Sequence, residues 1–284
     1  MQLCRLFPLL SNTTHLTTKQ LQTSFTAIHS DSRFVKQDSM FFALKGKTTN
    51  GNLFISQAIE KGAKIIVGQK ITRQIIKQHQ NIIFLQSKNP KKLLGEVVSK
   101  FYNKLPKNIF AVTGTNGKTS VAYFFCQMLE TINIKCASIG TLGVKCGDAK
   151  AIKECIISPL TTPDICSLYH NLSVLKKYNI DHVIIEASSI GLEQKRLHNL
   201  NINACAFTNF SKDHLDYHKS MKKYFDAKMK LFYHAKHNKI AILNTDIDQY
   251  NKINQICTQQ KIAVFSYGRT AYNIRLIDIN IENN

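Results

Sequence analysis

The chain has 284 residues, enough for two domains of ordinary size, and its 44% apolar and 20% charged residues are typical of a globular protein. No apolar run approaches the roughly 20 residues of a membrane-spanning helix, so no membrane span is predicted. The first ten residues are interrupted by Arg5 and Pro8, which argues against a secretory signal. Eight cysteines without a Cys-x-x-Cys pair predict reduced thiols and a cytoplasmic protein.

The charge is strongly positive, with 38 lysines and arginines against 18 acidic residues and a formal net charge of +20. This excess suggests a nucleic-acid partner. However, 32 of the basic residues are lysines and 6 are arginines, whereas phosphate recognition favours the planar arginine fork. Lysine, asparagine and isoleucine, which share A/T-rich codons, make up 88 residues, so codon bias explains the charge better. No nucleic-acid partner is predicted, and a basic nucleic-acid-binding protein stays the alternative of a different class.

Strands alternate with helical stretches along the chain, a pattern typical of layered α/β folds. The predicted strands are residues 40–44, 64–67, 82–85, 109–113, 137–141, 182–186, 204–208, 240–244 and 263–266. The predicted helices are residues 53–61, 91–102, 119–134, 164–178 and 220–235. The polar, proline-containing segment 103–108 predicts a linker between a domain at 1–107 and a domain at 108–284.

The sharpest motif follows the predicted strand 109–113 and reads Gly114-Thr115-Asn116-Gly117-Lys118-Thr119-Ser120. A strand, a glycine-bearing turn and a helix in succession are the context of a phosphate-binding loop. Its glycines let backbone N–H groups face the phosphates, and the helix N-terminus adds positive potential. Lys118 is predicted to reach the terminal phosphates and Thr119 to bind Mg²⁺. Val112 stands where the strict motif has its first glycine, so a chance Gly-Lys-Thr turn is the alternative.

Glu186 ends the apolar predicted strand 182–186, at the edge where α/β sheets place their ligands. A carboxylate there can hold Mg²⁺, and Ser188, Gln194 and Arg196 follow as groups suited to an anionic substrate. Without other motifs, a solvated glutamate at a strand end is the simpler interpretation.

The segment after predicted strand 204–208 carries Asp213, His214, Asp216 and His218 within six residues. Such a cluster suggests metal or phosphate binding, and a polar loop that caps the next helix explains it equally well.

Lys228 lies on the same side of predicted helix 220–235 as Phe225, Leu231 and Phe232. A partly buried lysine can lose its proton and become chemically available. An amphipathic helix with snorkelling lysines is the alternative, and the helix alone favours it.

Together and in this order, these segments resemble the Mur ligase family, the ATP-dependent amide-forming ligases of peptidoglycan precursor synthesis. Loop 114–120 resembles the family's shortened phosphate loop, in which Val112 is acceptable. Segments 158–164, 186–196 and 209–218 resemble the member that adds the third residue of the peptide, and segments 30–33 and 46–51 resemble its uridine-nucleotide contacts. The resemblance implies an α/β protein with a small N-terminal UDP-sugar-binding domain and an incomplete ATP-binding central domain.

The resemblance also implies a role for each matching residue. ATP would be bound by Gly114, Thr115, Asn116, Gly117, Lys118, Thr119, Ser120 and Asn209. The substrate UDP-MurNAc-L-Ala-D-Glu would be held at its nucleotide sugar by Ser30, Ser32, Lys47, Thr48 and Thr49, and at its dipeptide arm by Thr161, Thr162, Ser188, Gln194 and Arg196. Thr119 and Glu186 would bind one Mg²⁺ ion, and His214 would bind a second with Lys228 as a carbamoylated lysine. The implied catalytic residues are Lys118, Glu186, His214 and Lys228.

The implied reaction starts with ATP converting a substrate carboxylate into an acyl phosphate. The amino group of a diamino acid, meso-diaminopimelate or L-lysine, then attacks the acyl phosphate and leaves an amide. Other Mur ligases and folylpolyglutamate synthase share the loop and are the nearest alternatives. The Thr161-Thr162-Pro163 stretch favours the third-residue ligase.

The family's C-terminal domain, and the Asn-x-x-Asn helix that usually precedes it, have no counterpart in the 284 residues. The resemblance therefore implies a truncated polypeptide, its remainder lost or separately encoded, with a non-catalytic relic as the alternative. We expect residues 1–284 alone to bind ATP and the UDP-sugar but to form little tripeptide. An open crevice lets water hydrolyse the acyl phosphate before an amine attacks it.

Overall fold

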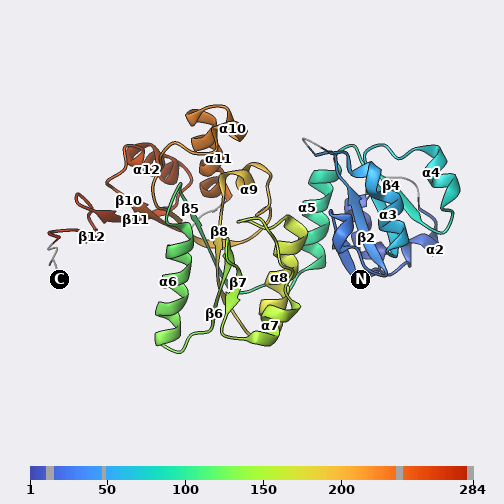
Figure 1. Ribbon diagram of the computed structural model, residues 1–284, viewed down its shortest axis with the longest axis horizontal. Coiled ribbons are helices and arrows are strands. Elements are labelled where there is room, and N and C mark those ends of the chain that lie inside the picture. Colours follow the sequence, from blue (N-terminus) through green and yellow to red (C-terminus); the bar gives the residue numbers. More distant parts are fainter. Residues whose placement is uncertain (11–15, 47–48, 235–238, 280–284) are drawn as a thin grey trace. The chain divides into compact units, whose positions relative to one another are not determined.

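The computed structural model describes residues 1–10, 16–46, 49–234 and 239–279 (Figure 1). The chain divides into two compact units, Met1–Asn103 and Lys104–Asn284. The division lies at the start of the polar segment 103–108, which separates the two predicted domains. Within the described ranges, no helix is both long and apolar enough to cross a membrane.

The first unit is built on a parallel sheet of four strands in the order β1-β2-β3-β4. All of β2 is buried, as is typical of a parallel strand with both faces covered. The strands are β1 (Ala27–His29), β2 (Ser39–Ala43), β3 (Ala63–Gly68) and β4 (Ile83–Gln86). The helices are η1 (Leu3–Leu6), α1 (Phe7–Leu10), α2 (Thr18–Leu21), η2 (Ser32–Phe34), η3 (Gly51–Phe54), α3 (Ile55–Glu60), α4 (Arg73–Gln78) and α5 (Pro90–Phe101).

The second unit is built on an eight-stranded sheet in the order β12-β11-β10-β9-β5-β8-β6-β7. Its pairings are parallel except for the antiparallel β6–β7 pair. The strands are β5 (Asn108–Thr113), β6 (Cys136–Gly140), β7 (Gly143–Cys146), β8 (His182–Glu186), β9 (Ile202–Phe207), β10 (Ile240–Asn244), β11 (Ala263–Gly268) and β12 (Ile274–Arg275). The helices are α6 (Lys118–Thr131), α7 (Ala149–Glu154), α8 (Ile165–Lys177), α9 (Ser189–Glu193), α10 (Leu215–His218), α11 (Met221–His234) and α12 (Tyr250–Gln259).

The topology of this sheet locates a crevice. Strand β5 is central: β8, β6 and β7 lie on one side of it and β9, β10, β11 and β12 on the other, so strand addition changes direction beside β5. At such a reversal the loops after neighbouring strands diverge, which opens a crevice at the carboxyl ends of the strands. The loops that follow β5, β6, β8 and β9 begin at Gly114, Thr141, Ala187 and Thr208. These loops carry the predicted residues Gly114 to Gly117, Ser188, Asn209 and His214.

The predicted strands and helices coincide with observed ones, with shifts at their ends. Helix α6 ends at Thr131 rather than 134 because Asn133 takes a left-handed backbone conformation, with φ of 60°. Strand β6 ends at Gly140, and Thr141 turns its N–H toward a side chain instead of the sheet. Residue 235 of the last predicted helix lies outside the described residues.

Several elements escaped prediction. Strands β1 and β12 have three and two residues, too few to show a period. Helix α12 buries only Ile253 and Cys257 among polar neighbours, so its apolar stripe is weak. Strand β7 is half-buried at the sheet edge and follows a glycine-bearing turn from β6.

Candidate active site

The loop between β5 and α6 is shaped by two glycines with positive φ. Gly117, with φ of 81°, precedes the first residue of α6, and no side chain caps the helix there. Gly114 has φ of 143°, and a Cβ on it would lie 1.9 Å from Thr208 Oγ1. Both positions therefore require glycine, and the backbone N–H groups at the start of α6 are available to an anion.

Replacement of Gly114 by alanine should destabilise the loop. Because the added Cβ meets Thr208 and the φ is unfavourable for an L-residue, we expect Gly114→Ala to lower the free energy of unfolding by about 2 to 4 kcal/mol. The matched control is Gly147→Ala, where a Cβ meets no atom within 4 Å. Urea denaturation monitored by circular dichroism measures both variants, and equal stabilities would contradict the steric argument.

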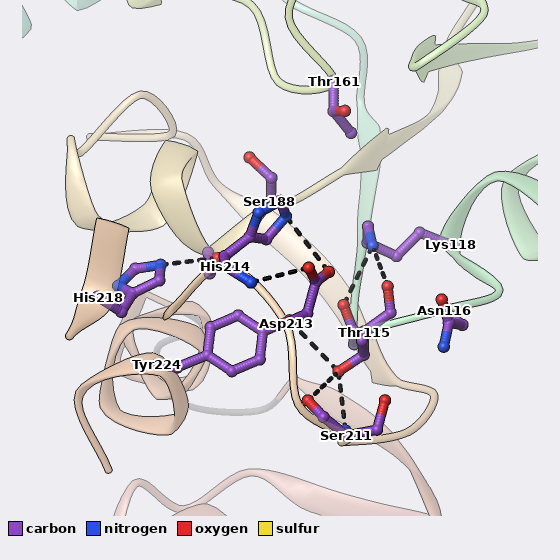
Figure 2. A network of polar contacts seen from close by, with 12 residues as sticks. Thr115, Asn116, Lys118, Thr161, Ser188, Ser211, Asp213, His214, His218 and Tyr224 are labelled. Carbon is purple, nitrogen blue, oxygen red and sulfur yellow. Dashed lines mark hydrogen bonds and ion pairs between the residues drawn. The ribbon is translucent and has the colours of Figure 1, made fainter. Parts of the chain in front are cut away.

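The segment after β9 holds the loop in place. Asn209 Oδ1 accepts a hydrogen bond from the Asn116 N–H at 2.8 Å, and the Asn209 carbonyl accepts one from the Thr115 N–H at 2.9 Å. Ser211 N–H donates to Thr115 Oγ1 at 3.0 Å, as Figure 2 shows. The predicted nucleotide-binding residue Asn209 thus contacts the loop backbone directly. Asn116 and Ser120 are exposed beside it.

Lys118 folds back over the loop. Its Nζ donates to the carbonyl oxygens of Thr115 at 2.8 Å and Gly114 at 3.1 Å (Figure 2). Burial lowers the pKa of Lys118, while the carboxylates of Glu186 and Asp213 oppose that shift. A cation so placed at the mouth of the loop suits the terminal phosphates of a nucleotide.

Glu186 lies at the centre of the site and is 2% exposed. Its Oε2 accepts a hydrogen bond from Thr119 Oγ1 at 2.8 Å, which joins the two residues predicted to share one Mg²⁺ ion. Thr141 donates its N–H to Oε1 at 3.0 Å and its Oγ1 lies 3.2 Å from Oε2. Gly140 permits this approach, since a Cβ on it would lie 1.9 Å from Oε1.

Four of the five residues predicted to hold the dipeptide arm form a network around the Glu186 backbone. Thr162 Oγ1 donates to the Glu186 carbonyl at 2.7 Å and lies 2.9 Å from Ser188 Oγ. Arg196 donates to the Thr162 carbonyl and, through Nη2, to Gln194 Oε1 at 2.8 Å. Burial lowers the pKa of Arg196. The fifth residue, Thr161, reaches the site through Thr141, whose Oγ1 lies 3.2 Å away.

His214 lies at the opposite rim in a left-handed conformation, with φ of 49°. Its Nε2 is 3.5 Å from Asp213 Oδ2, and its backbone N–H donates to Asp213 Oδ1 at 2.8 Å. The His214 ring packs against Tyr224 with centroids 6.2 Å apart (Figure 2). His218, by contrast, is buried, and its Nε2 contacts Ser189 Oγ at 3.0 Å, which indicates a packing role.

Lys228 is a fully buried lysine, 1% exposed, on α11. Its Nζ donates to the Gly114 carbonyl at 2.6 Å and lies 4.4 Å from the centroid of the Tyr224 ring. Burial lowers the pKa of Lys228 to about 7; the nearby Lys118 cation acts in the same direction and Asp213 opposes it. The structure therefore places the amine directly beneath the phosphate loop, and Tyr224 contacts both Lys228 and His214.

The oxygen atoms of Thr119 and Glu186 suit Mg²⁺, which takes few protein ligands and completes its shell with phosphates and water. In the part of the chain that the structure describes, no three His, Cys, Asp or Glu residues form a metal-binding cluster. A Mg²⁺ ion shared with nucleotide oxygens fits the donor set.

The residues predicted to contact the uridine nucleotide belong to the first unit. Ser32 Oγ donates to Gln57 Oε1 at 2.6 Å, and Ser30 is half-buried nearby in the chain. Thr49 is exposed, and its carbonyl accepts from the Gly46 N–H at 2.8 Å. Lys47 and Thr48 lie outside the described residues.

Sequence reasoning missed Thr141 and Tyr224 as parts of the site. Thr141 is the last residue of the predicted strand 137–141, and the same position at the end of a strand is the signal that identified Glu186. Tyr224 is buried on α11, and its hydroxyl donates to Thr115 Oγ1 at 3.3 Å. A tyrosine on an amphipathic helix has no feature in the sequence that marks it as part of a site.

In a comparison with known protein families, the family model of the Mur ligase middle domain matches residues 112–284. The model described as the Mur ligase family catalytic domain matches residues 24–102. The chain belongs to the Mur ligase family. This assignment confirms the family and the α/β fold class that the sequence motifs predicted.

Among Mur ligase relatives, the UDP-N-acetylmuramoyl-L-alanyl-D-glutamate–2,6-diaminopimelate ligase of Rickettsia montanensis is 39% identical over 241 residues, covering 84% of this chain and 49% of the relative. The enzyme of the same name from Bradyrhizobium diazoefficiens is 34% identical over 262 residues, covering 90% of this chain and 52% of the relative. The chain thus spans about half the length of these relatives.

Solved Mur ligase structures share the fold. A structure of a ligase with the same name as these relatives aligns with a TM-score of 0.69 at 23% identity, over 95% of this chain and 53% of that one. The MurF structure from Acinetobacter baumannii aligns with a TM-score of 0.65 at 16% identity, over 95% and 54% of the two chains.

Proposed function

We propose that this chain is the nucleotide- and UDP-sugar-binding part of an ATP-dependent ligase. The ligase joins meso-diaminopimelate to UDP-MurNAc-L-Ala-D-Glu in the cytoplasm during peptidoglycan synthesis. The contact of Thr119 with Glu186 at the mouth of a glycine-bearing loop carries the proposal, because it combines phosphate and Mg²⁺ ligands in one place. The names of the curated relatives support the substrate and the choice of diamino acid over L-lysine.

Each group of site residues would supply one part of the chemistry. Bound Mg²⁺ reduces the repulsion between a substrate carboxylate and the γ-phosphate, and Thr119 and Glu186 would hold one such ion. Lys118 and the N–H groups at the start of α6 neutralise the phosphates. Thr161, Thr162, Ser188, Gln194 and Arg196 orient the dipeptide arm, so that its carboxylate meets the γ-phosphate in line.

Lys228 and His214 would hold the second Mg²⁺ ion. A neutral Lys228 amine would attack CO₂: the N–C bond forms, one C–O π bond opens with its electron pair moving to oxygen, and the nitrogen releases a proton to solvent. The product is an anionic oxygen ligand in place of a lysine whose protonated form would repel Mg²⁺. Burial, which lowers the pKa of Lys228 to about 7, supplies the neutral amine near neutral pH. The carbamoylated lysine is therefore compatible with the chemistry of this buried position.

The proposed ligase includes more polypeptide than residues 1–284. The relatives are about twice as long as the segment matched here. One face of the neighbouring strands β10 and β11 exposes Ile240, Ile242 and Phe265; Ile242 is in register with Phe265, and Ile240 lies two residues before Ile242 on the same face. Parallel strands normally have both faces covered, so this apolar face suits contact with a further, separately encoded or continuous domain. Low tripeptide formation by residues 1–284 alone stays a prediction.

A binding titration tests the proposal against the nucleic-acid alternative. We expect saturable binding of UDP-MurNAc-L-Ala-D-Glu and of ATP with Mg²⁺ at physiological salt, measured by isothermal titration calorimetry. A single-stranded RNA oligomer serves as the comparison ligand, because lysine-driven RNA binding weakens steeply with salt. Tighter binding of RNA than of the UDP-sugar at that salt would reverse the assignment.

A further inference from the structure

The carboxylate of Glu186 is held by a residue outside the predicted site. Glu186 is buried, and a buried carboxylate needs hydrogen-bond donors to keep its charge and orientation. Thr119 supplies one donor, but its hydroxyl is also a predicted ligand of Mg²⁺. Thr141 supplies two further donors, the backbone N–H to Oε1 at 3.0 Å and the hydroxyl near Oε2 at 3.2 Å.

The hydroxyl of Thr141 has one proton for two oxygen neighbours. Its Oγ1 lies 3.2 Å from Glu186 Oε2 and 3.2 Å from Thr161 Oγ1. An ionised carboxylate can only accept, so the Thr141 proton is directed to Glu186. Thr161 must then donate its own proton to Thr141. The chain of hydrogen bonds therefore runs from Thr161 through Thr141 to Glu186.

We propose that Thr141 is a positioning residue that orients the Glu186 carboxylate for Mg²⁺ and connects it to Thr161 in the dipeptide-arm segment. This inference rests on the proposed Mg²⁺ site of Thr119 and Glu186. The turn between β6 and β7 permits the contact of Thr141 with Glu186. Gly140 leaves space for Glu186 Oε1, and Thr141 lies just after the end of β6, where its N–H is not paired within the sheet. The role does not require Thr141 to touch the reacting atoms.

The test compares the Mg²⁺ dependence of nucleotide binding in wild type and Thr141→Val, with ADP as the probe. Valine keeps the shape and the backbone N–H but removes the hydroxyl. We expect the Mg²⁺ concentration for half-maximal ADP binding to rise about tenfold, because one hydrogen bond to a charged group is lost. Thr141→Ser should restore it to within about threefold of wild type. ADP affinity in excess chelator should not change, which separates positioning from general loop damage.

The matched control is Thr131→Val, the same substitution on α6, where the hydroxyl donates to the Met128 carbonyl at 2.7 Å, away from Glu186. A Thr141→Val variant no different from this control, or one that loses ADP affinity equally with and without Mg²⁺, would overturn the positioning role alone. A wild-type chain without any Mg²⁺-dependent ADP binding would overturn the proposed metal site and the role of Thr141 with it.

Discussion

Replacement of Lys118 by alanine should remove most of the nucleotide affinity and leave the fold intact. In the structure Lys118 Nζ contacts loop carbonyls at 2.8 and 3.1 Å, so we expect this cation to lie within reach of the phosphates of a nucleotide bound at the loop. The variant would lose the charge-assisted hydrogen bonds from Lys118 to the nucleotide phosphates. Two such bonds correspond to about 3 kcal/mol or more, which raises the dissociation constant at least a hundredfold. Calorimetric titration of ATP with Mg²⁺ measures the affinity, and circular dichroism checks the fold.

The control for this variant is Lys145→Ala, because Lys145 is exposed on β7 of the same unit. Its ATP affinity should equal that of wild type, since removal of a solvated lysine changes the net charge but no loop contact. Unchanged ATP affinity in Lys118→Ala would refute the phosphate-loop assignment. An equal loss in both variants would attribute the binding to overall charge.

The sequence predicted the parts of the site that depend on local pattern. Gly114 and Lys118 follow one predicted strand and Glu186 ends another, and parallel strands bring their carboxyl ends to one edge regardless of the connections between them. Their proximity therefore follows from the alternation of strands and helices. The contact of Thr119 with Glu186, 67 residues apart in sequence, is the observed consequence.

Contacts that depend on side-chain packing could not be predicted. Lys228 is buried beneath the Gly114 carbonyl because α11 packs on the loop that follows β5. This is a contact between residues 114 positions apart in the sequence, which a local pattern does not reveal. The helix pattern alone favoured an amphipathic helix with exposed lysines, and only the family resemblance suggested a site at this position. Thr141 was missed because a threonine after a strand carries no charge that would mark it as functional.

The stability of the protein should depend on the protonation of Lys228. Its folded-state pKa is lowered to about 7, whereas an unfolded lysine titrates near 10.5. Between these values the unfolded state binds the extra proton, so the contribution of Lys228 to the free energy of unfolding rises with pH. The slope approaches 1.4 kcal/mol per pH unit above pH 8, falls to half of that at pH 7 and vanishes well below pH 7, so the contribution rises by about 2 kcal/mol between pH 7 and pH 9.

The measurement is urea denaturation of wild type and Lys228→Met over this pH range. Methionine fills the buried position without a titrating group, so subtraction of the two curves cancels the other ionising residues. Lys230→Met on the same helix is the matched control, because Lys230 pairs with Glu193 at the surface with the two side chains 37% and 41% exposed. We expect the Lys230 variant to follow the wild-type pH dependence. Parallel curves for wild type and Lys228→Met would show that Lys228 does not titrate in this range.

Carbon dioxide should then compete with the proton for the same amine. Because only the neutral amine attacks CO₂, the carbamate should form above pH 7 and disappear on acidification, as the amine becomes protonated. With ¹³C-labelled bicarbonate, wild type should show one carbamate carbon resonance that Lys228→Met lacks and Lys230→Met retains. Mg²⁺ together with ADP should increase its intensity, since the new carboxylate is a ligand for the ion. A resonance that survives in Lys228→Met would assign the carbamate to another amine, and its absence from wild type at every pH would remove the carbamoylated lysine from the proposed mechanism.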